Sequence, residues 1–194
     1  MVEKKGIFIC IEGLDGSGKT TQAKILAKKI SNAIYTSEPS KGLIGNYIRK
    51  SYLYSKKRFS PLVEALLFAA DRLEHLESEI IPALNGGKTV ICDRYVFSSL
   101  AYQGASGISL DWIETINKAI IYPDLAIFID INPEKSMCRL NSKKSLMENL
   151  KTQLKVRDIY MKFVEDKKLT LVNGDNSKTK VTEELFSILK NYFN

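Results

Sequence analysis

Residues 13–20 contain the groups that a protein needs to hold a polyphosphate. The segment reads Gly13-Leu14-Asp15-Gly16-Ser17-Gly18-Lys19-Thr20 and matches the pattern G-x-x-x-x-G-K-[ST] at every position. Its glycines let the backbone turn several N–H groups toward one phosphate, and Lys19 can bridge the β- and γ-phosphates of a nucleoside triphosphate. The hydroxyl of Thr20 can ligate Mg²⁺. We therefore expect residues 13–20, with Thr21, to bind Mg·ATP.

A magnesium ion in this cradle needs a carboxylate at the end of a neighbouring strand. Asp93 directly follows the apolar run 88–92 and is the leading candidate, while Asp130, at the end of the run 125–130, is the alternative. Glu12 ends the first apolar run, immediately before the cradle. It can hold the water shell of the metal or orient an acceptor, or it can serve as a structural hydrogen-bond acceptor for the loop.

A second group of side chains suggests a site for a nucleobase. Phe68, Arg72 and His75 follow the spacing i, i+4 and i+7, so they share one face of a helix. The ring can stack on a base, and the guanidinium can donate hydrogen bonds to a base carbonyl or a phosphate. A core phenylalanine beside a surface arginine would produce the same spacing.

Further polar residues follow the strand that ends at Asp93. Arg94 comes next, and Ser98, Tyr102 and Gln103 lie on the segment behind it. Together they can line a pocket that faces the γ-phosphate. Arg49, on a predicted helix over 42–54, is a further candidate for contact with a phosphate. This arrangement predicts ATP in the cradle and a small phosphorylated acceptor opposite it.

The rest of the chain supplies elements that can position these residues. Continuous apolar runs at 7–11, 33–36, 88–92, 125–130 and 169–172 are typical of strands buried in a parallel sheet. Helical patterns alternate with them; one begins at Ser60-Pro61 and is expected to end at Pro82 and Gly86-Gly87, and others cover 111–120, 133–140, 150–166 and 181–193. We expect one α/β domain over residues 1–194, with an insertion at 141–149.

Composition excludes several classes of protein. The 194 residues carry a net charge of +7 from 29 basic and 22 acidic side chains, but only six of the basic residues are arginines. No apolar run reaches the ~18 residues that span a bilayer. The chain also lacks a run of basic residues with interleaved aromatic ones, which would indicate binding to nucleic acid. Cys10, Cys92 and Cys138 are expected to be reduced core residues. We therefore expect a cytoplasmic protein with neither a membrane nor a nucleic-acid partner.

Several segments together resemble the thymidylate kinases, which transfer a phosphoryl group from ATP to dTMP. The likeness follows nearly the whole chain in order, and the matching segments are 11–22, 37–39, 66–72, 93–104 and 156–160. The cradle is shared with many kinases, whereas 66–72 and 93–104 are specific. The resemblance implies a three-layer α/β/α P-loop kinase fold, a five-stranded parallel sheet of order 2-3-1-4-5, a short lid and a homodimer.

The resemblance also implies roles for single residues. Phe68 stacks on thymine, Arg72 hydrogen-bonds the base edge, and Arg94 holds the acceptor phosphate. Ser98 and Gln103 lie near the base, Tyr102 sits under the sugar, and Asp15 approaches the 3′-hydroxyl. Glu12 and Asp93 act at the metal and on the acceptor side. The implied catalytic residues are then Lys19, Asp93, Arg94 and Glu12, and the implied metal-binding residues are Thr20, Asp93 and Glu12.

The chain departs from the family pattern in two places. Many relatives carry an arginine where this chain has Ser37, and many of those with glycine at position 16 carry an arginine-rich lid. Here residues 141–149 contain Lys143 and Lys144 but no arginine. A lid arginine stabilises transition-state charge through a planar fork that lysine lacks. Either the lysines substitute imperfectly, or Arg139 or Arg157 reaches in.

The sequence therefore predicts Mg- and ATP-dependent phosphorylation of dTMP to dTDP. Two alternatives stay open. The chain could be a kinase for another deoxynucleotide or a deoxynucleoside, or it could be a weakly active P-loop protein that senses nucleotides.

Overall fold

The computed structural model describes residues 6–53, 59–139 and 150–193, and the predicted lid at 141–149 lies outside them. Five strands form one all-parallel sheet in the order β2-β3-β1-β4-β5, which confirms the predicted topology. Their bounds are β1 Phe8–Gly13, β2 Ala33–Ser37, β3 Thr89–Asp93, β4 Leu125–Asp130 and β5 Thr170–Asn173. Because all five strands run the same way, their carboxyl ends meet at one edge of the sheet.

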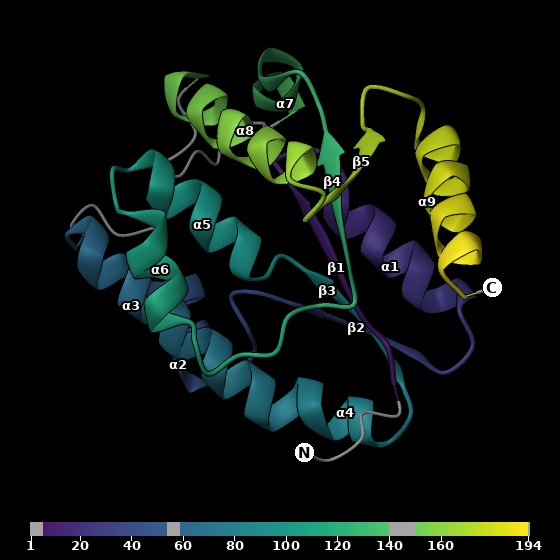
Figure 1. Ribbon diagram of the computed structural model, residues 1–194, viewed down its shortest axis with the longest axis horizontal. Coiled ribbons are helices and arrows are strands. Elements are labelled where there is room, and N and C mark those ends of the chain that lie inside the picture. Colours follow the sequence, from purple (N-terminus) through teal and green to yellow (C-terminus); the bar gives the residue numbers. More distant parts are fainter. Residues whose placement is uncertain (1–5, 54–58, 140–149, 194) are drawn as a thin grey trace.

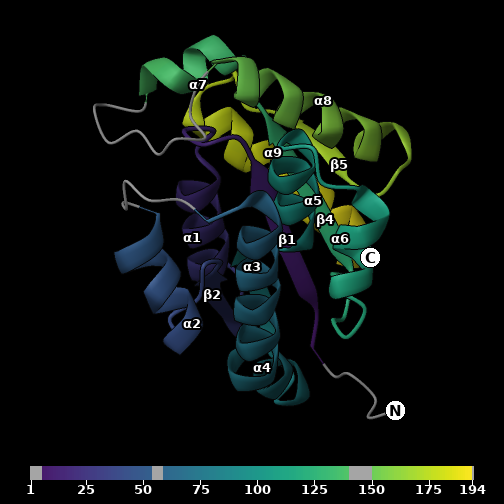
Figure 2. The same cartoon turned by 90° about the vertical axis from the view of Figure 1, so that its left-hand side faces the viewer.

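Helices cover both faces of this sheet, giving three layers (Figure 1). Helices α1 (Lys19–Lys29) and α9 (Lys178–Phe193) cover one face. The other face carries α3 (Pro61–His75), η2 (Leu76–Ile80), α4 (Ile81–Asn85), α5 (Val96–Ala105) and α8 (Leu150–Glu165). Shorter helices flank them: α2 (Leu43–Tyr47), η1 (Ile48–Tyr52), α6 (Leu110–Ile116) and α7 (Pro133–Arg139). Figure 2 shows α2 beside α3, at the outer side of the helices that cover this second face of the sheet.

The continuous apolar runs are explained by burial of the strands on both sides. All six residues of β1 are buried, and Cys10 lies opposite Cys92 on β3 and Ala126 on β4. The two faces of the sheet support separate hydrophobic clusters. Cys10 and Cys92 are buried and free as expected, but Cys138 is exposed on α7, so its assignment to the core is wrong.

The helix predicted to end at Pro82 and Gly86-Gly87 continues through Pro82 and ends at Asn85, directly before Gly86, so only the second of these two signals is confirmed. The backbone passes through a π-helical turn, η2, in which the N–H of Ile81 bonds to the carbonyl of Leu76. Pro82 then occupies the first turn of α4, where the N–H that proline lacks is not needed. At the other end, Ser60 and Pro61 start α3 as predicted, with Ser60 Oγ accepting from the N–H of Val63 at 3.4 Å.

Apolar residues recur at helical spacing from Leu62 to Ile80, but this stripe does not face the core along its whole length. Leu62 and Leu66 are each 49% exposed and Leu73 is 37% exposed, whereas the following η2 residues Leu76 and Ile80 are buried. The inward face of α3 instead carries buried polar residues: Glu64, Asp71, Arg72 and His75. These side chains bind the segment that follows β2, which leaves the leucines on the outside.

Helix α6 ends at Ile116, four residues before the predicted end at residue 120. Asn117 stops it, because its side-chain amide donates to the carbonyl of Ile113 at 2.8 Å and competes with the helical hydrogen bonds.

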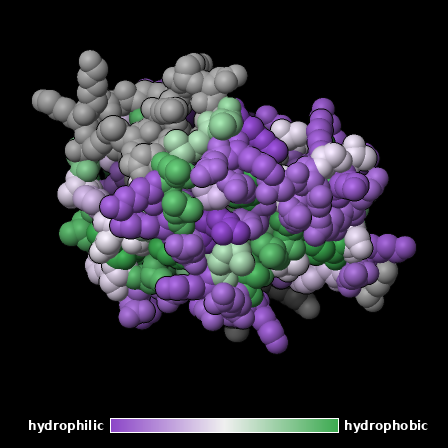
Figure 3. Space-filling view, turned by 90° about the horizontal axis from the view of Figure 1, so that it is seen from above, coloured by the Kyte–Doolittle hydropathy of each residue, from purple (hydrophilic) through white to green (hydrophobic). Residues whose placement is uncertain are grey.

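The surface seen from above in Figure 3 is mainly hydrophilic, with smaller hydrophobic groups between the polar side chains. None of the described helices combines the length and the hydropathy required to cross a membrane.

Candidate active site

The predicted cradle lies between the end of β1 and the start of α1, at the carboxyl edge of the sheet. Gly16 and Gly18 have φ angles of 81° and 91°, which L side chains rarely adopt, so this turn needs glycine. Lys19 is 6% exposed, and its Nζ donates to the carbonyl of Leu14 at 3.0 Å. The loop therefore places the lysine against its own backbone, at the amino end of α1.

Asp15 brings a negative charge into this loop, and two cations face it. Lys19 Nζ lies 3.7 Å from Asp15 Oδ1, and Arg94 Nη2 donates to the same oxygen. Burial favours the neutral acid, but the charges of Arg94 and Lys19 prevail and lower the pKa of Asp15 to about 2. Burial and the nearby Arg94 lower the pKa of Lys19. A phosphate entering the loop would share both cations with Asp15.

The carboxylate of Asp93 is the one that lies beside the cradle. The hydroxyl of Thr20 donates to Asp93 Oδ2, while Asp93 Oδ1 is buried and has no hydrogen-bond partner among the described residues. The rival Asp130 is paired with Arg157, whose Nε and Nη2 each lie 2.7 Å from a carboxylate oxygen. A hydroxyl next to a carboxylate oxygen with spare capacity suits Mg²⁺, which binds one or two protein oxygens together with substrate phosphates.

Glu12 is fully buried, and its carboxylate is occupied by protein groups. Its oxygens accept from the Tyr95 N–H at 2.9 Å, from the Ser98 hydroxyl at 2.6 Å and from the Tyr160 hydroxyl at 2.8 Å. Burial raises the pKa of Glu12, opposed by these hydrogen bonds and by the charge of Arg94. These contacts favour the structural interpretation, in which Glu12 joins β1 to the start of α5.

Arg94 connects the cradle to α5. It adopts a φ of 72°, unusual for a residue with a side chain, and its guanidinium reaches Asp15 in the loop. Its Nη1 donates to Ser98 Oγ at 2.9 Å, and its Cζ lies 4.9 Å from the centre of the Tyr102 ring. The structure thus brings together Arg94, Ser98 and Tyr102 of the predicted pocket, with Asp15 beside them, whereas Gln103 donates to Glu64 instead.

Arg72 is 1% exposed and makes several contacts inside the protein. Its Nε donates to Glu38 Oε2 at 3.0 Å and its Nη1 to Asn117 Oδ1 at 2.6 Å. Its Nη2 donates to the Tyr95 carbonyl at 3.2 Å and to Ser99 Oγ at 2.9 Å. All three guanidinium nitrogens of Arg72 therefore donate to protein acceptors. A base that binds to Arg72 would therefore contact a guanidinium whose orientation is already fixed by the protein.

The remaining predicted residues take different places. Phe68 is half-buried on α3, and Gln103 is buried with its amide donating to Glu64 at 3.3 Å. Arg49 donates to the carbonyls of Pro39 and Ser40, so its guanidinium lies on the loop after β2. Arg139 Nη1 lies 3.4 Å from the carbonyl of Gly16. Lys143 and Lys144 lie outside the described residues.

Three contributors had not been identified as site residues. Glu38 holds Arg72, Tyr160 holds Glu12, and Ser136 on α7 donates to the carbonyl of Asp15. Glu38 directly follows β2, so the strand-end argument that selected Asp93 could also have found it. Tyr160 and Ser136 carry no such signal, because a tyrosine or serine within a helix is common and its partner depends on packing.

Comparisons with known proteins agree with this geometry. The chain matches the family model described as thymidylate kinase over residues 11–185. The probable thymidylate kinase of Pyrococcus abyssi is 43% identical over 198 residues, which cover 96% of this chain and 97% of that protein. The corresponding protein of Methanococcus aeolicus is 41% identical over 186 residues, which cover 92% of this chain and 91% of its own.

Solved structures give the same result. The thymidylate kinase of Candida albicans superposes with a TM-score of 0.86 at 29% identity, covering 96% of this chain and 92% of that one. The thymidylate kinase of Ehrlichia chaffeensis gives a TM-score of 0.76 at 31% identity, covering 95% and 98%. The phosphate cradle, the parallel sheet of order 2-3-1-4-5 and these matches along almost the entire chain show that the protein belongs to the thymidylate kinase family.

Proposed function

We propose that this protein transfers the γ-phosphoryl group of Mg·ATP to the 5′-phosphate of dTMP, giving dTDP. The contact of Arg94 with Asp15 carries the proposal, because it joins the donor cradle to the segment assigned to the acceptor. Phosphoryl transfer needs reacting oxygens in line and neutralisation of the charge on the transferred group. Both tasks fall to groups that meet at this edge of the sheet.

On the donor side, residues 13–21 hold the phosphates through backbone N–H groups and Lys19. Thr20 and Asp93 are the residues that would hold Mg²⁺, which supplies charge neutralisation at the phosphate oxygens when bound. We assign Glu12 to the positioning of Ser98 and Tyr160, consistent with the hydrogen bonds that both hydroxyls donate to it, and not to direct metal ligation. Arg139 stands at the cradle and is our candidate for the role of the missing lid arginine.

On the acceptor side, Arg94 holds the phosphate of dTMP and Phe68 stacks on its base. Arg72 donates to the base edge from a guanidinium that Glu38, Asn117 and Ser99 hold in place. Tyr102 borders the sugar, and Asp15 approaches its 3′-hydroxyl. Ser98 and Gln103 lie close to the base, and Arg49, bound to the loop after β2, supports the acceptor side from outside.

We also propose that the enzyme is a homodimer assembled through the outer face of α2 and α3. Seven large hydrophobic residues of this region are exposed: Leu43, Tyr47, Phe59, Leu62, Val63, Leu66 and Leu73. A contiguous exposed apolar face is typical of a protein interface.

The three free cysteines favour a reducing compartment, so we place the enzyme in the cytoplasm.

The decisive experiment is a coupled assay with Mg·ATP and a panel of acceptors that contains dTMP, dUMP, dCMP, dGMP and thymidine. We expect dTMP to give the highest kcat/KM. A higher value for another acceptor would overturn the substrate assignment, and tight ATP binding without turnover on any acceptor would indicate a nucleotide sensor. The breadth of the panel matters because the Candida albicans relative is described as having broad substrate specificity.

A further inference from the structure

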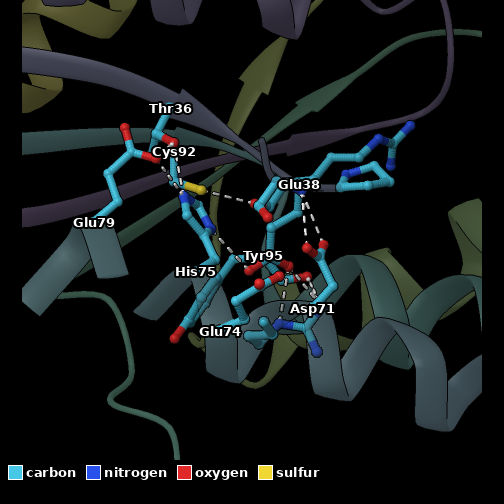
Figure 4. A network of polar contacts seen from close by, with 12 residues as sticks. Thr36, Glu38, Asp71, Glu74, His75, Glu79, Cys92 and Tyr95 are labelled. Atoms are coloured by element: carbon cyan, nitrogen blue, oxygen red, sulfur yellow. Dashed lines mark hydrogen bonds and ion pairs between the residues drawn. The ribbon is translucent and has the colours of Figure 1, made fainter. Parts of the chain in front are cut away.

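The single histidine of the chain, His75, occupies a buried position that the proposed mechanism does not use. It lies at the end of α3, is 1% exposed, and faces polar groups from both sides of its ring (Figure 4). Its Nε2 lies 2.7 Å from Thr36 Oγ1 on β2 and 3.4 Å from Glu79 Oε2. Its Nδ1 lies 3.4 Å from Glu38 Oε1.

Each nitrogen of the ring meets a polar side chain from another segment of the chain. The hydroxyl of Thr36 lies between His75 Nε2 and Glu79 Oε2, and it donates to Glu79 Oε2 at 2.9 Å. On the other side of the ring, Nδ1 faces a carboxylate oxygen, which can only accept. The imidazole thus connects strand β2 at one nitrogen to Glu38 at the other.

Glu38 links this histidine to Arg72. Glu38 is 6% exposed, and its Oε2 accepts from Arg72 Nε at 3.0 Å and lies 2.8 Å from Nη2. The other oxygen, Oε1, faces His75. A carboxylate held at both oxygens cannot rotate freely, so His75 restrains the same group that orients the Arg72 guanidinium.

We propose that His75 is a positioning residue, which acts through Glu38 to hold Arg72 in the orientation that selects the acceptor base. The inference rests on the proposed acceptor role of Arg72. A guanidinium only donates hydrogen bonds, so it favours the O4 carbonyl of thymine over the amino group that cytosine presents at that place. Selection of this kind depends on a fixed donor, and a loosely held guanidinium would discriminate less.

Three substitutions at position 75 separate the two sides of the ring. Asparagine can place its amide nitrogen where Nδ1 stands and keep the contact with Glu38, whereas glutamine can place its amide where Nε2 stands and keep the contact with Thr36. Leucine removes both. Each variant is assayed for kcat, for the KM of ATP and dTMP, and for the ratio of kcat/KM between dTMP and dCMP.

We expect H75L to raise the KM of dTMP about tenfold and to lower the dTMP-to-dCMP ratio by a similar factor, the size typical of residues that orient a ligand-binding group. The KM of ATP and kcat should change by less than about twofold. H75N should recover most of the loss and H75Q little of it. Equal values for H75N and H75Q, or an unchanged ratio in folded H75L, would overturn the inference.

Two further variants make the outcome unambiguous. T36V removes the hydrogen bond between Oγ1 and Nε2, so it should lower the melting temperature and leave the KM of dTMP within about twofold. R72K tests the assumption on which the inference rests. If R72K leaves the KM of dTMP and the dTMP-to-dCMP ratio unchanged, the acceptor role of Arg72 fails and the inference fails with it. If R72K changes both but H75L changes neither, only the inference fails.

Discussion

The guanidinium of Arg94 lies against the carboxylate of Asp15, although 79 positions separate the two residues in the chain. Arg94 follows β3 and Asp15 follows β1, and these strands are neighbours in the sheet. Parallel strands place their carboxyl ends side by side, so the contact is a direct result of the topology. It joins the loop to which we assign the donor phosphates to the segment to which we assign the acceptor.

The lysine of the cradle is expected to be essential for turnover and dispensable for folding. Among the residues that the structure describes, the polar partners of the Lys19 side chain belong to its own loop, namely the Leu14 carbonyl and the Asp15 carboxylate. We predict that K19A lowers kcat by about 10³-fold, since it removes a cation placed at the transferred phosphoryl group. Circular dichroism should show an intact fold. K28A, at the exposed end of α1, is the matched control, and turnover of K19A near that of K28A would refute the role of Lys19.

The charge of Asp15 should contribute to stability above pH 4 and lose this effect in acid. Its pKa in the folded protein is about 2, below the ordinary value of 3.8, so the ionised form is favoured by folding. The contribution is present at neutral pH and disappears as the pH falls from about 4 to about 2. With allowance for the partial exposure of the side chain, we expect D15N to lower the free energy of unfolding by about 1–2 kcal/mol at pH 6.

Urea denaturation of the wild type and D15N at pH 6, 4, 3 and 2 measures this effect. The difference between the two proteins should shrink as the pH falls and vanish near pH 2. A difference that stays constant over this range would show that the interaction of Asp15 with Arg94 and Lys19 does not depend on its ionisation.

The two arginines near the predicted lid should differ in function. Arg139 reaches the carbonyl of Gly16 in the cradle, whereas Arg157 forms a two-point ion pair with Asp130. We predict that R139A lowers kcat by about 10²-fold, the usual effect of removing one group that stabilises transition-state charge. R157A should leave kcat within about twofold and lower the free energy of unfolding by about 1 kcal/mol.

Steady-state kinetics and denaturation of both variants test this assignment, with the double variant K143A/K144A as a third arm. If R157A has the larger effect on kcat, the assignment is reversed. If only the lysine variant slows turnover, the lysines replace the arginine of the family pattern.

A charge on the outer face of α3 should separate the proposed dimer. Leu66 is 49% exposed in the single chain, so L66K costs little in a monomer but places a charge inside the interface. Light scattering should give twice the 21.9 kDa chain mass for the wild type and the chain mass for L66K. L171K, on the exposed part of β5, should remain dimeric. A monomeric wild type, or a dimeric L66K, would exclude this interface.

Much of the donor site could be predicted because it is local in the sequence. The cradle occupies eight consecutive residues between a buried strand and a helix, and its conformation depends on glycines and a helix end that lie within the same segment. The parallel sheet could also be predicted, since strands that are buried on both faces appear in the sequence as continuous apolar runs. Hydrogen bonding and burial within short stretches of chain are enough to decide these features.

The partners of the charged residues were decided only by the tertiary structure. Asp93 and Asp130 both end apolar strands, and only the fold shows that Thr20 lies beside the first and Arg157 beside the second. Glu12 likewise allowed two interpretations until Ser98 and Tyr160 were seen to occupy its oxygens.

The orientation of α3 is a second feature that the sequence alone could not predict. Its sequence indicates an apolar stripe, but the polar face turns inward because the residues after β2 offer partners for Arg72 and His75. A polar side chain is buried only where another segment satisfies its hydrogen bonds. That segment lies more than 30 residues away in the chain, so periodicity within the helix could not reveal it. The sequence by itself determined the elements and the phosphate cradle, whereas packing decided which side chains meet around it.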